Sequence, residues 1–136
     1  MKKRIVILTR LLIFSLSIVI LSSTTCKKDE THYNITIKNN SNSAIYVTMT
    51  TAYPDTLILC PWGFFEISQN SNFNIESTYG WEEDFKGIET LQIFIIDANI
   101  AKTTPCDTIR KYNMILKRYA LTYNDLQNNN WSITYP

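Results

Sequence analysis

Apolar and polar side chains alternate along several short stretches of the chain. Residues 33–38 and 45–50 each place an apolar side chain at every second position, ending with Ile37 in the first and Met49 in the second. This period of two is typical of a half-buried β-strand. The Asn/Ser-rich residues 39–43 between them form a predicted turn, because Asn tolerates left-handed backbone angles. We therefore predict that the two strands pair as a β-hairpin.

The same reasoning predicts further strands along the chain. Residues 91–96 are almost entirely apolar and rich in β-branched side chains, which favours a central strand buried on both faces. The remaining predicted strands are residues 57–60, 65–68, 73–79, 114–119 and 131–135.

Short helices are predicted between some of these strands. Residues 81–86 have a helical pattern that Gly87 ends, and residues 107–112 form a predicted helical turn capped by Asp107. Thr122 and Asp125 have the spacing of a capping box, which predicts a helix that frays at residues 128–130. We expect loops at 53–56 and 99–104, and we interpret Asp97-x-Asn99 as a turn.

These elements indicate a mainly β fold. About seven short strands separated by turn signals favour a single antiparallel β-sandwich-like domain or small barrel with one or two short helices. The chain has no β-α-β spacing, which argues against a parallel α/β sheet.

The N-terminal residues have a different pattern. A basic start at residues 2–4 is followed by an apolar run at 11–21, small residues at 22–25 and Cys26. This order is typical of a secretory signal peptide, and the run is shorter than the roughly 20 residues of a membrane-spanning helix. We predict a signal peptide over residues 1–25, a tether over 26–32 and a β-rich domain over 33–136.

Cys26 and its neighbours resemble the lipobox of bacterial lipoproteins, with Ser23 and Thr25 where that family usually has Leu and a smaller residue. The following Lys27-Lys28-Asp29-Glu30 resembles the export signal of Bacteroidetes surface lipoproteins. Residues 115–119 and 131–136 are similar to the C-terminal segment of small uncharacterised Bacteroidetes lipoproteins, a family without an established activity.

The resemblance implies that Cys26 carries fatty acyl chains, as in a palmitate-modified lipoprotein, and becomes the first residue of the mature chain. It also implies an outer-membrane location facing the cell exterior. Several acyl chains are needed for stable anchoring, because one chain binds a bilayer only marginally. Two alternatives stay open: an ordinary signal peptide with an incidental cysteine, and an uncleaved N-terminal anchor.

Charge argues against a nucleic-acid partner. Residues 26–136 contain nine Lys and Arg against twelve Asp and Glu, a net charge of 9 − 12 = −3. A mildly acidic domain lacks the basic surface that nucleic acid requires.

The residues that usually support catalysis are scarce, and we predict that the protein is not an enzyme. His32 is the only histidine and falls in the predicted tether, which cannot position a catalytic base. No His pair, Cys-x-x-Cys or glycine-rich phosphate loop is present, so no metal or cofactor is expected. Consecutive acidic residues 82–84 point in different directions on a helix and are interpreted as a solvated face.

Aromatic side chains are the main candidates for binding. Trp62 lies in a predicted loop between Pro61 and Gly63, and Tyr53 begins another loop. Exposed rings of this kind can stack on sugars or anchor a protein interface. Trp81 and Trp131 are predicted to pack in the core instead.

Two short motifs resemble the O-glycosylation acceptor of exported Bacteroidetes proteins. They are Asp55-Thr56-Leu57 and Asp107-Thr108-Ile109, which would make Thr56 and Thr108 the modified residues.

Cys60 and Cys106 would be the remaining cysteines after lipidation of Cys26, and an exported chain meets an oxidising compartment. Each lies beside a proline at the edge of a predicted element, so a disulfide between them is possible. The alternative is that Cys60 is a buried free thiol.

The sequence therefore predicts a membrane-anchored surface lipoprotein that binds a protein or glycan or has a structural role. The alternative is a small hydrolase that uses carboxylates, which would need them to converge in a cleft.

Overall fold

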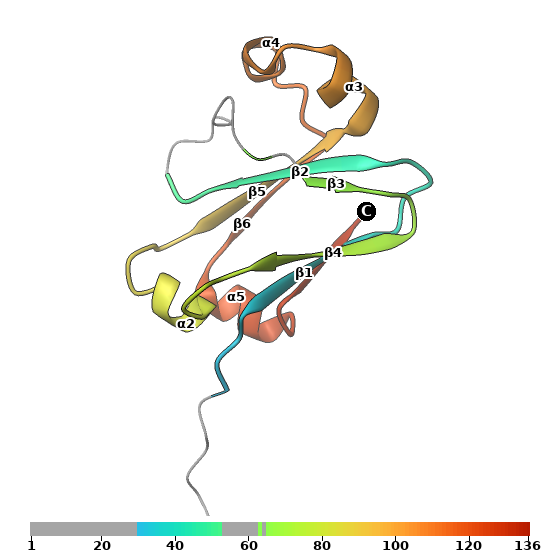
Figure 1. Cartoon of the computed structure of the whole chain (residues 1–136). Coiled ribbons are helices and arrows are strands. Elements are labelled where there is room, and N and C mark those ends of the chain that lie inside the picture. Colours follow the sequence, from blue (N-terminus) through green and yellow to red (C-terminus); the bar gives the residue numbers. More distant parts are fainter. Residues whose placement is uncertain (1–29, 53–62, 64) are drawn as a thin grey trace, which may run out of the picture. The chain divides into compact units, whose positions relative to one another are not determined.

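The computed structural model describes residues 30–52, 63 and 65–136, and residues 31–136 form one compact unit. Figure 1 shows its strands and helices in sequence order. The strands are β1 (Asn34–Asn39), β2 (Ile45–Thr50), β3 (Phe65–Ile67), β4 (Ser71–Glu76), β5 (Leu91–Asp97), β6 (Lys117–Leu121) and β7 (Ser132–Tyr135). The helices are α2 (Trp81–Asp84), α3 (Ala98–Thr103), α4 (Cys106–Lys111) and α5 (Tyr123–Asn128).

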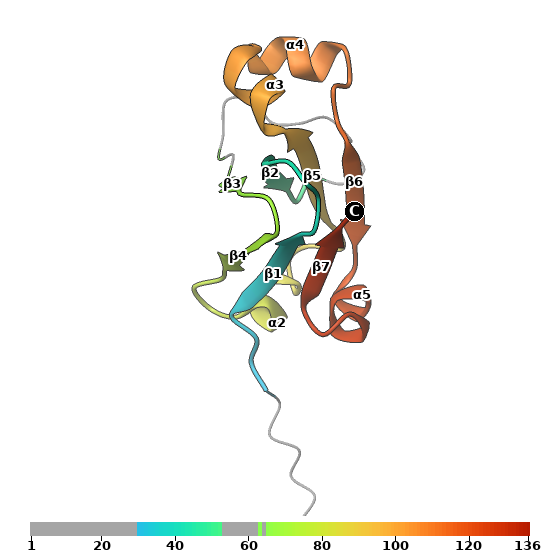
Figure 2. The ribbon, with the colours of Figure 1, turned by 90° about the vertical axis from the view of Figure 1, so that its right-hand side faces the viewer.

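The described strands form two sheets, so the prediction of a mainly β fold with short helices is confirmed. The described residues form four helices, however, where one or two were predicted. One sheet has three strands in the order β4-β1-β7, and the other has four in the order β3-β2-β5-β6. Figures 1 and 2 place α2 and α5 at one end of the unit, where β1 begins, and α3 and α4 at the opposite end.

The predicted hairpin is wrong, although both of its strands exist. β1 pairs with β4 and β7, whereas β2 pairs with β3 and β5 in the other sheet. The fully buried side chain of Asn39 explains the change, because its amide nitrogen lies 2.8 to 3.2 Å from the carbonyl oxygens of Ser43, Ile67 and Ser68. Its Oδ1 accepts hydrogen bonds from Ser41. These bonds make residues 39–43 a corner between sheets.

The expectation of wholly antiparallel pairing is also wrong for one strand pair. β7 runs parallel to β1, with Ile133 opposite Ile37, while the other described pairs are antiparallel. Strands that are distant in sequence can pair in either direction, because no tight turn fixes their orientation.

The main hydrophobic core combines side chains from both sheets. Ile35, Ile75 and Ile133 come from the three-stranded sheet, and Val47 and Ile93 come from the four-stranded sheet. All of these side chains are buried, and burial of such a residue contributes roughly 1.5 to 3 kcal/mol.

β5 is an interior strand with six buried residues in succession, which confirms the predicted central strand. Its alternate side chains Phe94 and Ile96 face away from the main core. They form a second cluster with Ile109 of α4, and Ile100 of α3 packs against it. The two helices therefore cover part of the outer face of the four-stranded sheet.

Helix boundaries correct two further predictions. The predicted loop at 99–104 is mostly α3, and Asp97 caps it by accepting hydrogen bonds from the N–H groups of Asn99 and Ile100. A turn-forming Asp and a helix cap look alike in sequence because both use the same side-chain oxygen. Asp107 does not cap α4, because that helix begins at Cys106 after Pro105.

Other boundaries agree more closely with the sequence. The helix predicted at 81–86 is present as α2, and the capping box of Thr122 and Asp125 begins α5 as predicted. The strand predicted at 114–119 is shifted and becomes β6, and the strand predicted at 73–79 ends earlier, at Glu76. The strand predicted at 57–60 lies outside the described residues. Among the described residues, no helix is long and apolar enough to span a bilayer.

Candidate functional site

A large hollow lies where the main core opens to solvent beside α2, and we call it the acidic groove. Its volume is about 720 Å³. It is lined by Met49, Thr50, Thr51, Glu76, Ser77, Thr78, Tyr79, Trp81, Asp84, Gly87, Ile88 and Leu91.

The apolar floor of the acidic groove continues from the core. Leu91 begins β5 and belongs to the core, and Met49 lies opposite Ile93 near the end of β2. Trp81 is buried at the start of α2, and its indole N–H has no hydrogen-bond partner among the described residues. A ligand acceptor or a water that reached this N–H would make a hydrogen bond that the protein leaves unmade.

Tyr79 forms the exposed rim of the acidic groove, with 76% of its surface exposed. The turn that presents it is fixed by Ser77, whose Oγ accepts hydrogen bonds from the N–H groups of Tyr79 and Gly80. Gly80 has a φ of 94°, and a Cβ there would collide with the side chain of Thr31. The rim is therefore built on a turn that requires glycine.

The polar lining of the acidic groove consists of hydroxyl and carboxyl groups. Glu76 ends β4 and Asp84 ends α2, so two separate elements supply a carboxylate to the same hollow. The hydroxyls of Thr50, Thr51 and Thr78 add donors and acceptors. The combination of an aromatic rim, an apolar floor and acceptor groups is typical of a site for a polar ligand with an apolar face.

His32 is bound to the domain beside this site, so it does not belong to a tether. Its Nδ1 lies 2.8 Å from Glu82 Oε1, and its backbone N–H donates to Glu82 Oε2 at 2.9 Å. Its ring stacks on Trp131 at 4.6 Å between centroids, and its carbonyl accepts from the N–H of Trp81.

Despite burial, the contacts with His32 lower the pKa of the Glu82 carboxyl group. Burial alone would raise its pKa, but the hydrogen bonds from the ring and backbone of His32 outweigh burial and hold the pKa below its ordinary value. Glu82 therefore stays ionised and orients the His32 ring against Trp131.

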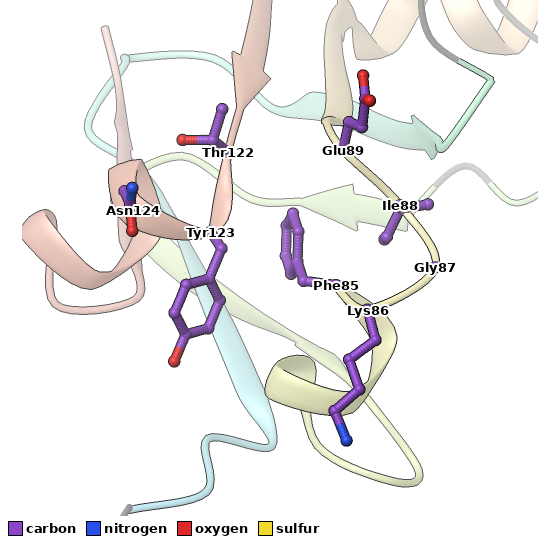
Figure 3. Close-up of a pocket in the computed structure, with 8 residues that line it drawn as sticks. All are labelled: Phe85, Lys86, Gly87, Ile88, Glu89, Thr122, Tyr123 and Asn124. Carbon is purple, nitrogen blue, oxygen red and sulfur yellow. The ribbon is translucent and has the colours of Figure 1, made fainter.

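A smaller hollow of about 400 Å³ lies next to the acidic groove and shares Gly87 and Ile88 with it. Figure 3 shows the rings of Phe85 and Tyr123 beside each other in this hollow, and they meet edge to face at 5.9 Å. Tyr123 also meets Trp131 edge to face at 5.7 Å. This packing holds α2 and α5 next to each other beside the acidic groove.

The predicted site residues fall into two groups. Trp81 and Trp131 are buried in the core, as predicted. Cys26, Tyr53, Thr56, Cys60 and Trp62 lie outside the described residues, so their roles remain predictions.

Two predicted site residues lie in the described α4. Thr108 is partly buried there, and its glycosylation stays a prediction. Cys106 is disulfide-bonded, and the predicted pairing with Cys60 stays a prediction because the other cysteines are outside the described residues.

The acidic residues 82–84 do not act together. Glu82 pairs with His32, Glu83 pairs with Lys86, and Asp84 lines the acidic groove. In the described part of the chain, no group of three His, Cys, Asp or Glu residues is placed to hold a metal ion.

Sequence reasoning did not identify Tyr79, Glu76 or Asp84 as site residues. Tyr79 fitted an alternating strand, and only the Gly80 that follows it indicated a turn. Glu76 and Asp84 come together through the fold, for which the sequence holds no local signal.

Comparison with known proteins finds no match for this chain among family models, curated proteins or solved structures.

Proposed function

We propose that this protein is a lipid-anchored surface lipoprotein of the outer membrane and that its β-sandwich-like domain binds a glycan in the acidic groove. The anchor is Cys26, and the domain faces the cell exterior. In this proposal the protein binds its ligand without chemical change and needs no cofactor.

The observation that supports glycan binding is the exposed Tyr79 in a groove that hydroxyl- and carboxyl-bearing residues also line. A sugar has an apolar face that stacks on an aromatic ring and hydroxyls that donate to carboxylates. Glu76 at the end of β4 and Asp84 at the end of α2 can supply such acceptors. The groove volume of about 720 Å³ is large enough for a small oligosaccharide.

Replacing Tyr79 tests this proposal. Tyr79→Ala in the full chain should weaken binding to the best ligand of a neutral oligosaccharide panel by about fivefold or more, because an aromatic anchor contributes about 1 kcal/mol or more. Isothermal titration calorimetry measures the affinity. Tyr112→Ala is the matched control, since Tyr112 is similarly exposed but lies outside the groove. Equal affinities in all three proteins, or no glycan bound, would contradict the proposal.

One observation favours the alternative of a small hydrolase that uses carboxylates: Glu76 and Asp84 line the same hollow. Glycoside hydrolases place two carboxyl groups roughly 5 to 10 Å apart across the scissile bond. A hydrolase would release reducing ends from a bound oligosaccharide, and Glu76→Gln would abolish that release. Binding without release supports the non-enzymatic role.

The anchor is tested separately. Cys26→Ala should abolish fatty-acid labelling and move the protein out of the membrane fraction, because the acyl chains would be lost. Unchanged labelling would overturn lipidation, and loss of labelling with retained membrane association would favour an uncleaved N-terminal anchor. Protease added to intact cells should remove the domain if it faces the exterior.

A further inference from the structure

Residues 111–118 run from the last residue of α4 into the first two residues of β6, and we call them the basic–apolar segment. Tyr112, Met114 and Leu116 are large apolar side chains with exposed fractions of 63%, 38% and 48%. They are half of the six large apolar side chains that are exposed in the described part of the chain. Such a concentration in one short segment is typical of an interaction surface.

The fold holds this segment in place from both sides. Ile115 packs against the cluster formed by Phe94, Ile96 and Ile109. The N–H of Met114 donates to the carbonyl of Ile109, and the N–H of Leu116 donates to the carbonyl of Ile95. A partner would therefore find the apolar side chains already positioned, which lowers the entropy cost of binding.

Disulfide bonding gives α4 a further constraint at its first residue, Cys106. Ile109, one turn later, is completely buried. The exposed side chains of the basic–apolar segment therefore follow a helix whose Cys106 and Ile109 pack with Phe94 and Ile96 of β5.

The charges of the segment are all positive. Lys111, Lys117 and Arg118 are exposed, and residues 111–118 contain no Asp or Glu. The nearest acidic residue in sequence, Asp107, already pairs with Arg110 at 3.0 Å. This concentration of cations stands out because residues 26–136 carry a net charge of −3.

We propose that the basic–apolar segment binds a protein partner whose Asp and Glu side chains surround an apolar anchor. The apolar side chains Tyr112, Met114 and Leu116 would contact the anchor, and Lys111 and Arg118 would pair with the acidic side chains. Arg118 lies opposite Phe94 on the outer face of the sheet, whereas Lys117 lies opposite Ile95 on the other face. Opposite charges around an apolar centre increase the association rate and select the partner.

The position of the segment favours a protein over a membrane surface, and this step depends on the proposed anchor at Cys26. The chain enters β1 at the end that holds α2 and α5, while α4 lies at the opposite end (Figures 1 and 2). Four residues lie between Cys26 and Thr31, and the five peptide units of this stretch span at most about 18 Å. The segment therefore follows α4 at the end of the described unit that is opposite to the end where the chain enters from Cys26.

The experiment uses the full chain in nanodiscs of neutral lipid, with two synthetic peptides as probes. One peptide alternates glutamate and leucine, and the other alternates lysine and leucine. The acidic peptide should bind and the basic one should not. Binding should weaken as salt is added, because exposed charges are screened.

Charge reversal locates the binding site. Arg118→Glu should weaken binding of the acidic peptide by about fivefold, the effect of losing an exposed charge pair, because Arg118 lies opposite Phe94 on the outer face. Lys86→Glu is the matched control, because Lys86 is equally basic and exposed but lies just after α2. Leu116→Ser should weaken binding of the acidic peptide without changing how that binding depends on salt concentration.

Four results would overturn the proposal. Equal binding of both peptides, or equal loss in both charge-reversal variants, would remove the charge argument. Capture of phosphatidylglycerol vesicles without binding of the acidic peptide would identify a lipid surface instead. Self-association that Arg118→Glu abolishes, in the absence of peptide binding, would identify a second copy as the occupant. Glycan binding in the acidic groove is measured independently and does not affect these outcomes.

Discussion

The acidic groove lies at the N-terminal end of β5, whereas the basic–apolar segment runs beside its C-terminal half. Leu91 lines the groove, and Ile95 pairs with Lys117 of the segment. The groove is concave and displays carboxylates, while the segment is exposed and displays cations. Leu91 and Ile95 are four residues apart on β5, a distance of about 13 Å along the strand.

The two regions also depend on different packing. The groove opens from the main core between the sheets, which contains Ile93. The segment rests on the smaller cluster around Phe94 on the outer face of the same sheet. Because neighbouring strand residues face opposite sides, one strand supports two surfaces that mutations can alter separately.

The variant with the largest expected effect tests whether the groove and the basic–apolar segment depend on different packing. Phe94→Ala should lower the free energy of unfolding by about 3 to 5 kcal/mol, because it leaves a cavity under α3 and α4. Below its melting temperature, the variant should bind the acidic peptide more weakly and keep the affinity of the groove. Chemical denaturation and the two binding assays measure these changes.

Ile93→Ala is the matched variant on the opposite face of β5. It should lower the free energy of unfolding by about 2 to 5 kcal/mol and weaken glycan binding in the groove more than peptide binding. If both variants weakened both binding activities equally, the two regions would not be independent.

Breaking the disulfide bond of Cys106 should have the next largest effect, and it should alter the basic–apolar segment more than the groove. If Cys60 is the partner, the bridge closes a loop of about 46 residues and contributes on the order of 4 kcal/mol in the chain-entropy model, less any strain. Adding a reductant should lower the melting temperature and weaken binding of the acidic peptide, while glycan affinity in the groove should change little.

The Cys60→Ser variant should reproduce the effect of the reductant and then be insensitive to it. Cys26→Ser is the control and should keep its response to the reductant. The opposite pattern in these two variants would assign the bond to Cys26.

The smallest expected effect is a pH dependence that Glu82 contributes at the end that holds the groove. The pKa of Glu82 is lowered in the folded state, so its ionised form stabilises the fold above the unfolded-state pKa of about 4.3. This contribution is lost as the pH falls through the folded-state pKa. Glu82→Gln should therefore lower stability by about 1 kcal/mol at neutral pH and reduce its decline in acid.

Glu83→Gln is the neighbouring control, because Glu83 is exposed and pairs only at the surface with Lys86. It should change stability by about 0.5 kcal/mol or less and keep the acid dependence of the parent. Thermal melts across the acidic range measure both variants. An unchanged acid response in Glu82→Gln would show that the contact with His32 contributes nothing to stability.

Local patterns in the sequence were sufficient to locate much of the secondary structure. Alternation identified β1 and β2, continuous apolarity identified β5, and the pair Thr122 and Asp125 identified the start of α5. These signals are reliable because a strand's period of two and a helix cap involve only residues close in sequence.

The sequence could not assign strand partners or bring the groove together. The buried amide of Asn39 separates β1 from β2 by bonding to carbonyls near the end of β3, 28 and 29 residues away. His32 looked like a tether residue because its partner Glu82 is 50 residues distant. Asp97 and residues 99–104 were misassigned because of an ambiguous local signal. A turn and a helix cap use the same local hydrogen bonds, so the sequence does not distinguish them.

The sequence by itself therefore determined where apolar faces lie, which Trp residues are buried and how α5 begins. The tertiary structure decided which strands pair, that β7 runs parallel to β1, and that Glu76, Tyr79 and Asp84 share one groove. The physical reason is that periodicity and capping are properties of neighbouring residues. Pairing and site assembly depend on side chains that meet only after long loops have closed.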